Sequence, residues 1–251
     1  MATIVSVHSF RGGTGKSNTT ANVAAVLAAQ GKRVGVIDGD IQSPGIHTLF
    51  GLSSDDVTST LNDFLWHGKS IGEVALDVTD RQNANLPGKI FLIASSMQPG
   101  EITRVLREGY DARYLTEGIR AMVTELGLDV LVLDTHPGLN EETLLSLVIS
   151  DSLLIIMRPD RQDYEGTGIT ARVAKELQVP KINLLVNKAP ESLDHAQIAR
   201  QAEAAYGCPV VAVLPHSDDL MLLASEGLFV LRHPDHPVSD IYRTVANAVA
   251  A

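Results

Sequence analysis

Phe10-Arg11-Gly12-Gly13-Thr14-Gly15-Lys16-Ser17 is a glycine-rich turn between an apolar run, Thr3-Ile4-Val5-Ser6-Val7, and a helix-like run from Ser17 to Leu27. This order of strand, glycine turn and helix predicts a phosphate-binding loop. Three glycines let successive backbone N–H groups surround an anion, and the positive end of the following helix points at the same place. In such a loop Lys16 reaches the terminal phosphates of a nucleotide, and the Ser17 hydroxyl ligates Mg²⁺.

Six further apolar runs follow, each short and nearly continuous: Val34–Ile37, Ile90–Ile93, Val130–Leu133, Leu153–Ile156, Ile182–Val186 and Val210–Val213. Near-continuous hydrophobicity suits strands that are covered on both faces. Helical patterns lie between the runs, at Glu101–Leu126, Glu141–Ile149, Tyr164–Leu177, Leu193–Tyr206 and Val238–Ala250. The alternation predicts a doubly wound α/β fold with a mostly parallel sheet, whose ligands bind at the carboxyl ends of the strands.

The composition favours one cytoplasmic domain, residues 1–251. The chain has 251 residues, is 45% hydrophobic and contains no Ser/Gly-rich linker, so one core can organise all of it. Cys208 is the single cysteine, the chain does not start with a secretion signal, and no apolar stretch reaches the ~20 residues that span a bilayer. The net charge of −10 argues against a dominant attraction to polyphosphate surfaces, although it leaves a local basic patch open.

The ordinary phosphate-loop pattern G-x-x-x-x-G-K-[ST] fails here, because its first glycine would fall on Phe10. The sequence instead resembles the deviant Walker A loop, K-G-G-x-G-K-[ST], of the ParA/MinD family of P-loop ATPases. Arg11 stands where that family has a signature lysine, which reaches across a dimer interface to the partner's nucleotide. A guanidinium keeps the charge and can grip two phosphate oxygens. Two interpretations remain: Arg11 acts as a trans arginine finger, or it is a solvent-facing arginine.

Two carboxylate motifs follow apolar runs in the order that the resemblance requires. In Asp38-Gly39-Asp40, the resemblance implies that Asp40 orients the attacking water and that Asp38 supports the loop or the hydrated metal; the alternative is that Asp38 caps a turn. In Asp134-Thr135-His136-Pro137-Gly138, it implies that Asp134 holds Mg²⁺ through water. His136 stands where the family has a small residue or proline, and we interpret it as a partly exposed turn residue rather than a nucleotide or adaptor contact.

The resemblance also places the base. Asn187 follows a strand, as the family's adenine-reading asparagine does, and Pro215 matches the turn that contacts the base. Guanine recognition would ask for an acidic residue two positions after Lys188, where the chain has Pro190; a turn-capping role for Asn187 stays open. The predicted nucleotide-binding residues are therefore Arg11, Gly12, Gly13, Thr14, Gly15, Lys16, Ser17, Asn18, Asp38, Asn187 and Pro215.

The resemblance implies an ATPase with ATP and Mg²⁺ as ligands, Ser17 and Asp134 at the metal, and Lys16, Asp40 and Arg11 as catalytic residues. It would form a homodimer when ATP is bound, respond to an adaptor protein, and position or partition a cellular cargo. One alternative is a nucleotide-dependent switch with little hydrolysis; another is a metabolic P-loop ligase, for which we find no second-substrate motif. Cys208 alone cannot supply the cluster ligands of iron–sulfur relatives, and only Tyr242 lies where tyrosine kinases of this fold carry a cluster.

Non-specific DNA binding is a further implication of the ParA resemblance. The candidate basic residues alternate with acidic ones, which favours a solvated mixed-charge face: Arg158, Arg161, Arg172, Lys175 and Lys181 with Asp160, Asp163, Glu165 and Glu176. The segment Asp240–Ala251 has one arginine and no bulky apolar face, so we expect it to pack on the sheet rather than bind a membrane as MinD relatives do.

Overall fold

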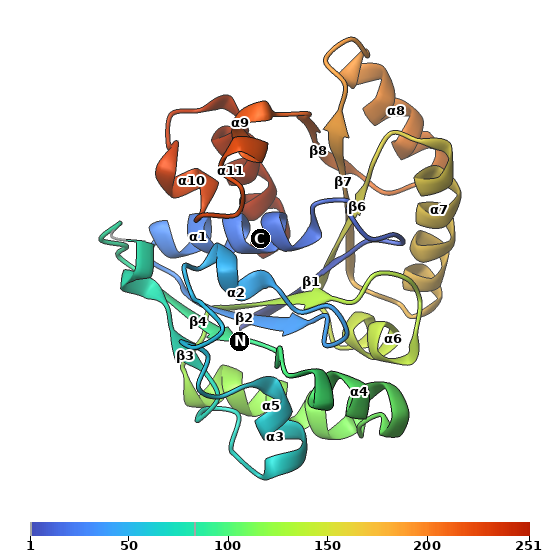
Figure 1. The fold of residues 1–251 in the computed structure, drawn as a ribbon. Helices are drawn as coiled ribbons and strands as arrows, with labels where there is room; N and C mark the ends of the chain where they lie inside the picture. Colours follow the sequence, from blue (N-terminus) through green and yellow to red (C-terminus); the bar gives the residue numbers. More distant parts are fainter. Residues whose placement is uncertain (1, 83) are drawn as a thin grey trace.

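The computed structural model describes residues 2–82 and 84–251 and contains one eight-stranded sheet in the order β3-β4-β2-β5-β1-β6-β7-β8 (Figure 1). The strands are β1 (Thr3–His8), β2 (Arg33–Gly39), β3 (Leu76–Asp77), β4 (Lys89–Ile93), β5 (Val130–Thr135), β6 (Ser152–Met157), β7 (Lys181–Ala189) and β8 (Val210–Pro215). Only the β3–β4 pair is antiparallel among the strands of the described residues. The predicted doubly wound, mostly parallel sheet is confirmed.

Every apolar run named from the sequence became a strand. The reason is visible in the burial of the central strands: all residues of β5 and β6 are buried, as a strand covered on both faces requires. The two-residue edge strand β3 was not predicted, because two residues carry no periodic signal.

The helices form two layers. They are α1 (Lys16–Ala29), α2 (Ile46–Leu49), α3 (Leu61–His67), α4 (Pro99–Glu108), α5 (Ala112–Glu125), α6 (Glu141–Val148), α7 (Arg161–Glu176), α8 (His195–Tyr206), α9 (Asp218–Leu222), α10 (Phe229–Arg232) and α11 (Pro237–Ala250), with a 3₁₀ turn at Thr79–Gln82. Helices α1, α10 and α11 share one core cluster with the sheet, whereas α5 and α7 cover the opposite face (Figure 1). The phosphate-loop helix α1 thus lies in the middle of the molecule.

The prediction of one continuous helix over Glu101–Leu126 is wrong. The chain forms two helices, α4 and α5, because Gly109 takes a positive φ of 63° and Asp111 then caps the second helix by accepting a hydrogen bond from the Arg113 amide. The apolar spacing continues on both sides of this break, so periodicity alone joined the two helices. Gly31, which follows the C-cap residue Gln30 of the first helix, has a positive φ of 87°.

The C-terminal helix α11 packs on the sheet, as expected from its sequence. Tyr242, Val245, Ala246 and Val249 are fully buried between α11 and its neighbours. No helix among the described residues is long and apolar enough to cross a membrane. The apolar face of α11 is therefore used inside the fold.

Candidate phosphate-binding site

The glycine loop joins β1 to α1 and borders an open cavity. Gly13 and Gly15 have φ values of 79° and 92°, which side-chain-bearing residues rarely adopt, and a Cβ on Gly15 would lie 2.4 Å from Asn187 Nδ2. A Cβ on Gly12 or Gly13 would meet no atom within 4 Å, so the loop backbone faces open space. The cavity of about 290 Å³ is lined by Ser9, Gly12, Gly13, Thr14, Gly15, Lys16, Ser17, Asn18, Asp40, Pro137 and Lys188.

Lys16 and Asp134 form a buried ion pair at the centre of the site. Lys16 Nζ lies 2.7 Å from Asp134 Oδ1, and the two side chains are 7% and 1% exposed. Thr20 of α1 donates to the same oxygen at 3.2 Å. Asp134 Oδ2 is buried and meets no hydrogen-bond donor in the described part of the chain. Asp134 therefore contacts α1 through Oδ1, whereas Oδ2 has no hydrogen-bond partner among the described residues.

Asp38 and Asp40 lie beside Asp134 because β2 and β5 are adjacent in the sheet. Asp38 pairs in register with Asp134, and a Cβ on Gly39 would approach the Asp134 carbonyl to 2.9 Å. Asp38 accepts hydrogen bonds from the Asp40 and Gly45 amides, each at 3.2 Å. Burial, together with the nearby Asp134 carboxylate, raises the pKa of Asp38 to about 7. Asp38 therefore holds the loop after β2, whereas Asp40 alone of this pair lines the cavity.

His8 ends β1 directly below the loop. Its Nδ1 lies 2.8 Å from Thr135 Oγ1. The Thr135 hydroxyl donates its own hydrogen to the Val7 carbonyl at 3.0 Å, so it can only accept from His8, and Nδ1 therefore carries the ring hydrogen. Burial, with Lys16 nearby, lowers the pKa of His8 to about 3. His8 is neutral at neutral pH and fixes the spacing of β1 and β5.

The end of β7 closes the other side of the loop. Asn187 is 2% exposed, donates to the Thr14 carbonyl at 2.7 Å and accepts from the Lys188 amide. Lys188, which sequence reasoning missed, has a positive φ of 56° and donates through Nζ to the Gly13 carbonyl at 2.8 Å. Asn187 thus joins the phosphate loop in the structure, and its predicted contact with a base remains a prediction.

A second hollow of about 770 Å³ adjoins the phosphate cavity, with Lys188 lining both. Its wall contains Pro215, whose contact with a base remains a prediction, and residues from the starts of α9 and α11. His236 ties these helices together: Nδ1 accepts from the Val238 amide and Nε2 lies 3.2 Å from Asp219. The hollow is thus connected to the phosphate cavity through a shared wall at Lys188.

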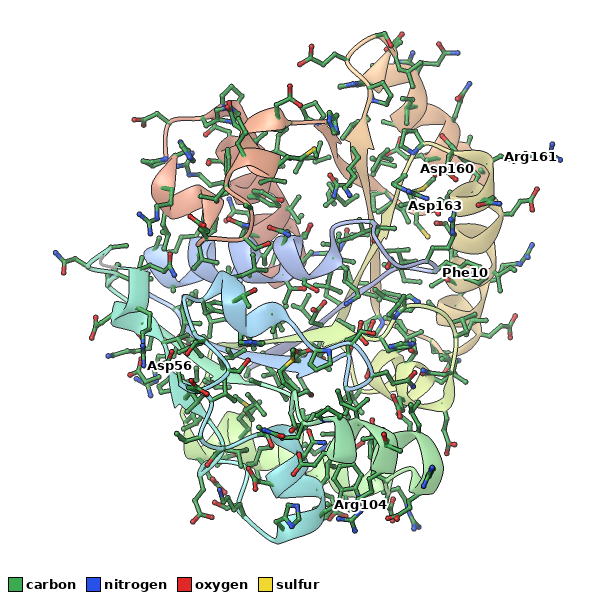
Figure 2. All side chains as sticks on the ribbon, in the orientation of Figure 1. Phe10, Asp56, Arg104, Asp160, Arg161 and Asp163 are labelled. Carbon is green, nitrogen blue, oxygen red and sulfur yellow. The ribbon has the colours of Figure 1, made fainter. Side chains whose placement is uncertain are left out.

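Arg11 does not line the cavity, and its side chain contacts the N-terminal end of α7. Its guanidinium is 3.5 Å from Asp163 and 3.8 Å from Asp160, and the Arg11 side chain is 39% exposed. Arg158 pairs with the same two aspartates. The neighbouring Phe10 lies against α7 in Figure 2, and a Cβ on Gly166 would come within 2.1 Å of its ring. The start of the loop is therefore docked on α7.

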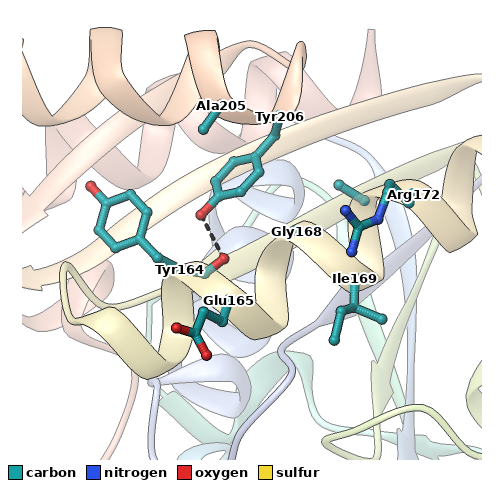
Figure 3. A pocket seen from close by; sticks show the side chains of 8 residues that line it. Tyr164, Glu165, Gly168, Ile169, Arg172, Ala205 and Tyr206 are labelled. Atoms are coloured by element: carbon teal, nitrogen blue, oxygen red, sulfur yellow. Dashed lines mark hydrogen bonds between the residues drawn. The ribbon is translucent and has the colours of Figure 1, made fainter.

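Three of the five basic residues considered for DNA binding contact other groups of the chain. Arg158 pairs with Asp160 and Asp163, Arg161 lies 3.3 Å from Glu165, and Lys175 donates to the Tyr206 carbonyl. These contacts fit the mixed-charge face expected from the sequence. Helices α7 and α8 also enclose a groove of about 440 Å³, crossed by a hydrogen bond from the Tyr206 hydroxyl to the Tyr164 carbonyl (Figure 3). None of its lining residues lines the phosphate cavity.

The donor set fits a nucleotide with its metal. Thr14 Oγ1 and Asp134 Oδ2 are buried without a partner among the described residues, and both belong to the predicted set. Each buried polar atom of this kind costs free energy unless a ligand or water satisfies it. Ser17 lines the cavity and supplies the oxygen donor that Mg²⁺ prefers. The residues present therefore suit a Mg²⁺–nucleotide ligand.

Comparisons with known proteins agree with this geometry. The chain is 27% identical over 247 residues to an uncharacterized ATP-binding protein of Methanocaldococcus jannaschii, covering 98% of this chain and 87% of that one. An iron-sulfur cluster carrier protein of Aquifex aeolicus is 25% identical, and the alignment covers 98% of this chain and 67% of that protein.

Solved structures match the fold closely. The septum site-determining protein MinD of Pyrococcus horikoshii, complexed with Mg-ADP, has a TM-score of 0.80 at 20% identity, with 98% of this chain and 95% of that chain covered. A ParA family ATPase of Chlorobium tepidum has a TM-score of 0.79 at 17% identity, covering 99% and 100%. A family model described as an AAA domain matches residues 2–185, nearly three quarters of the chain. The chain belongs to this family and has the fold of the ParA/MinD P-loop ATPases.

Proposed function

We propose that this chain is an ATP-dependent switch that binds ATP and Mg²⁺, forms a homodimer in the ATP state and hydrolyses ATP slowly until an adaptor protein stimulates it. The observation that carries the proposal is the shared cavity of the glycine loop, Lys16, Ser17 and Asp40. It combines phosphate-binding backbone, a cation, a metal donor and a carboxylate for water, which together make up the parts that phosphoryl transfer requires.

Each residue has a separate task in this proposal. The backbone of Gly12–Gly15, together with Asn18, binds phosphate oxygens, and Lys16 exchanges Asp134 for the terminal phosphates. Ser17 and Asp134 hold Mg²⁺, which neutralises phosphate charge when bound. Asp40 holds the water that attacks the γ-phosphorus, so that the bond to the bridging oxygen breaks and ADP and phosphate leave.

The adenine lies in the hollow beside Pro215, with Asn187 supporting the base or the loop. The size of this hollow and its shared wall with the phosphate cavity support that placement. By analogy with ParA and MinD, the ATP-driven cycle positions or partitions a cargo in the cytoplasm, with residues 1–251 acting as one domain. Non-specific DNA is a candidate anchoring surface. Direct membrane binding by α11 is disfavoured because its apolar face is buried.

Arg11 acts in trans in this proposal, as the signature lysine does in relatives. Its present contacts are long, at 3.5 Å to the buried Asp163 and 3.8 Å to the exposed Asp160, and a pair between exposed side chains such as Arg11 and Asp160 contributes about 0 to 1 kcal/mol. A partner's phosphates offer a guanidinium two strong acceptors instead. The contact of Arg11 with α7, away from the cavity, also favours one alternative: a switch that binds ATP and hydrolyses little.

Phosphate release tests the hydrolytic part of the proposal. Wild-type protein in excess over ATP should release phosphate in a single turnover. Asp40→Ala should bind ATP with similar affinity but release phosphate at least about a hundredfold more slowly. Asp55→Ala, an exposed aspartate far from the cavity, serves as the matched control. Equal rates for wild type and Asp40→Ala would remove Asp40 from catalysis, and no release by wild type would favour the non-hydrolysing alternative.

Substitution of Arg11 tests the trans contact. Arg11→Ala should leave ATP affinity within about threefold of wild type, because the cis cavity does not contain this side chain. It should abolish ATP-dependent dimerisation or turnover. Arg158→Ala removes the other arginine that pairs with Asp160 and Asp163, and it should retain ATP-dependent dimerisation and turnover. Unchanged dimerisation and turnover in Arg11→Ala would leave Arg11 without a trans role.

A further inference from the structure

The loop after β5 places an imidazole directly behind the predicted water-holding carboxylate. His136 Nδ1 lies 2.7 Å from Asp40 Oδ1, and the two side chains are only 21% and 14% exposed. His136 is thus partly exposed, as expected from the sequence, but its contact with Asp40 was not expected. Since a carboxylate oxygen only accepts hydrogen bonds, Nδ1 is the donor in this contact.

The two oxygens of Asp40 are treated differently by the protein. Oδ1 accepts from both His136 Nδ1 and the Ser43 amide, the latter at 3.2 Å. Within residues 2–82 and 84–251, no protein donor is bonded to Oδ2. Asp40 lines the phosphate cavity, whereas His136 does not. The imidazole therefore holds Asp40 through Oδ1 without itself lining the phosphate cavity.

His136 is itself held in place at its backbone. Its carbonyl accepts from Thr143 Oγ1 of α6 at 3.3 Å, and two residues later the Gly138 amide donates to the Ser9 carbonyl at 3.1 Å. The turn from His136 to Gly138 thus spans α6 and the start of the phosphate loop. A side chain anchored in this way can impose an orientation on Asp40 rather than follow it.

We propose that His136 is a positioning residue for hydrolysis, which orients the Asp40 carboxylate by holding Oδ1 so that Oδ2 is presented to the attacking water. The inference rests on the proposed ATP hydrolysis. It assigns to His136 no contact with nucleotide or metal. Because hydrolysis depends on the placement of one water, a loosely held Asp40 should slow the chemical step without weakening ATP binding.

Single-turnover hydrolysis of the full chain, paired with a titration of ATP binding, separates this role from others. His136→Ala should slow phosphate release by about tenfold to a hundredfold, with ATP affinity within about threefold of wild type. His136→Asn places an amide N–H near the position of Nδ1 and should recover most of the rate. His67→Ala, which removes an exposed histidine from α3, should match wild type.

The outcomes decide between the possibilities. A wild-type rate in His136→Ala would overturn the positioning role, as would an Asn variant as slow as the Ala variant. A parallel loss of ATP affinity in both variants would show that His136 only maintains the loop structure. If wild-type protein releases no phosphate, the proposed hydrolysis fails first, and this inference fails with it; hydrolysis by wild type with no effect of His136 removes this inference alone.

Discussion

The two sides of the phosphate loop differ in how firmly they are held. On the inner side, Lys16 and Asp134 are 7% and 1% exposed and lie 2.7 Å apart, at the start of α1 and near the end of the central strand β5. On the outer side, Arg11 is 39% exposed and its contacts to α7 are 3.5 and 3.8 Å. Breaking a buried pair costs about 3 to 5 kcal/mol, whereas a pair between exposed side chains, such as Arg11 and Asp160, contributes about 0 to 1 kcal/mol. The inner half is therefore preformed, and the outer half is free to change partner.

The largest expected effect comes from removing the cation of the inner half. Lys16→Ala should weaken ATP binding by at least about a hundredfold, because charge-assisted hydrogen bonds of this kind contribute up to about 3 kcal/mol each. Titration with a fluorescent ATP analogue measures the change. Lys32→Ala, which removes an exposed lysine beyond the C-terminal end of α1, is the matched control and should bind ATP as wild type does. ATP affinity within about threefold of wild type in Lys16→Ala would contradict the preformed inner half.

Acid should weaken the inner half through His8. Its pKa falls from 6.5 to about 3 on folding, so between these values the unfolded chain binds a proton that the folded chain does not. This contribution to stability is complete above pH 6.5 and is lost as the pH falls, by about 2 kcal/mol at pH 5. His8→Gln stays neutral and should lose correspondingly less stability between pH 7.5 and pH 5. Denaturant titrations at the two pH values measure the difference, and equal losses for both proteins would show that His8 does not carry it.

The smallest effect concerns the docking of the outer half on α7. Gly166→Ala would put a Cβ 2.1 Å from the Phe10 ring, so it should destabilise the protein by about 1 kcal/mol and displace the residues next to Arg11. Gly168→Ala, two positions on, meets only an ordinary contact at 3.4 Å and should be neutral or stabilising by up to about 1 kcal/mol. Thermal melts of both variants give the sign. Equal stabilities would mean that Phe10 does not depend on Gly166.

The inner half could be predicted from the sequence because its signals are local. Each apolar run marks a strand, and the motifs at the strand ends must then meet at one edge of a parallel sheet. The outer half could not be predicted. Arg11 and Asp163 are 152 residues apart, and nothing in either sequence neighbourhood indicates that α7 begins beside the loop.

Two details of the site and one of the fold also could not be predicted, for physical reasons. Lys188 takes a left-handed backbone conformation, which a lysine rarely signals, and so reaches the Gly13 carbonyl. The contact of His136 with Asp40 depends on the register in which β2 pairs with β5, and the hydrophobic pattern of the sequence does not specify this register. Helices α4 and α5 share an apolar spacing, so their separation at Gly109 became clear only from the backbone.

The central claim is that ATP in the preformed half draws two chains together. Size-exclusion chromatography with light scattering tests it on the Asp40→Ala variant, which should keep ATP intact during the run. The variant should have the mass of one chain with ADP and of two chains with ATP and Mg²⁺. The same mass in both nucleotide states, at concentrations where ATP saturates the site, would contradict the account.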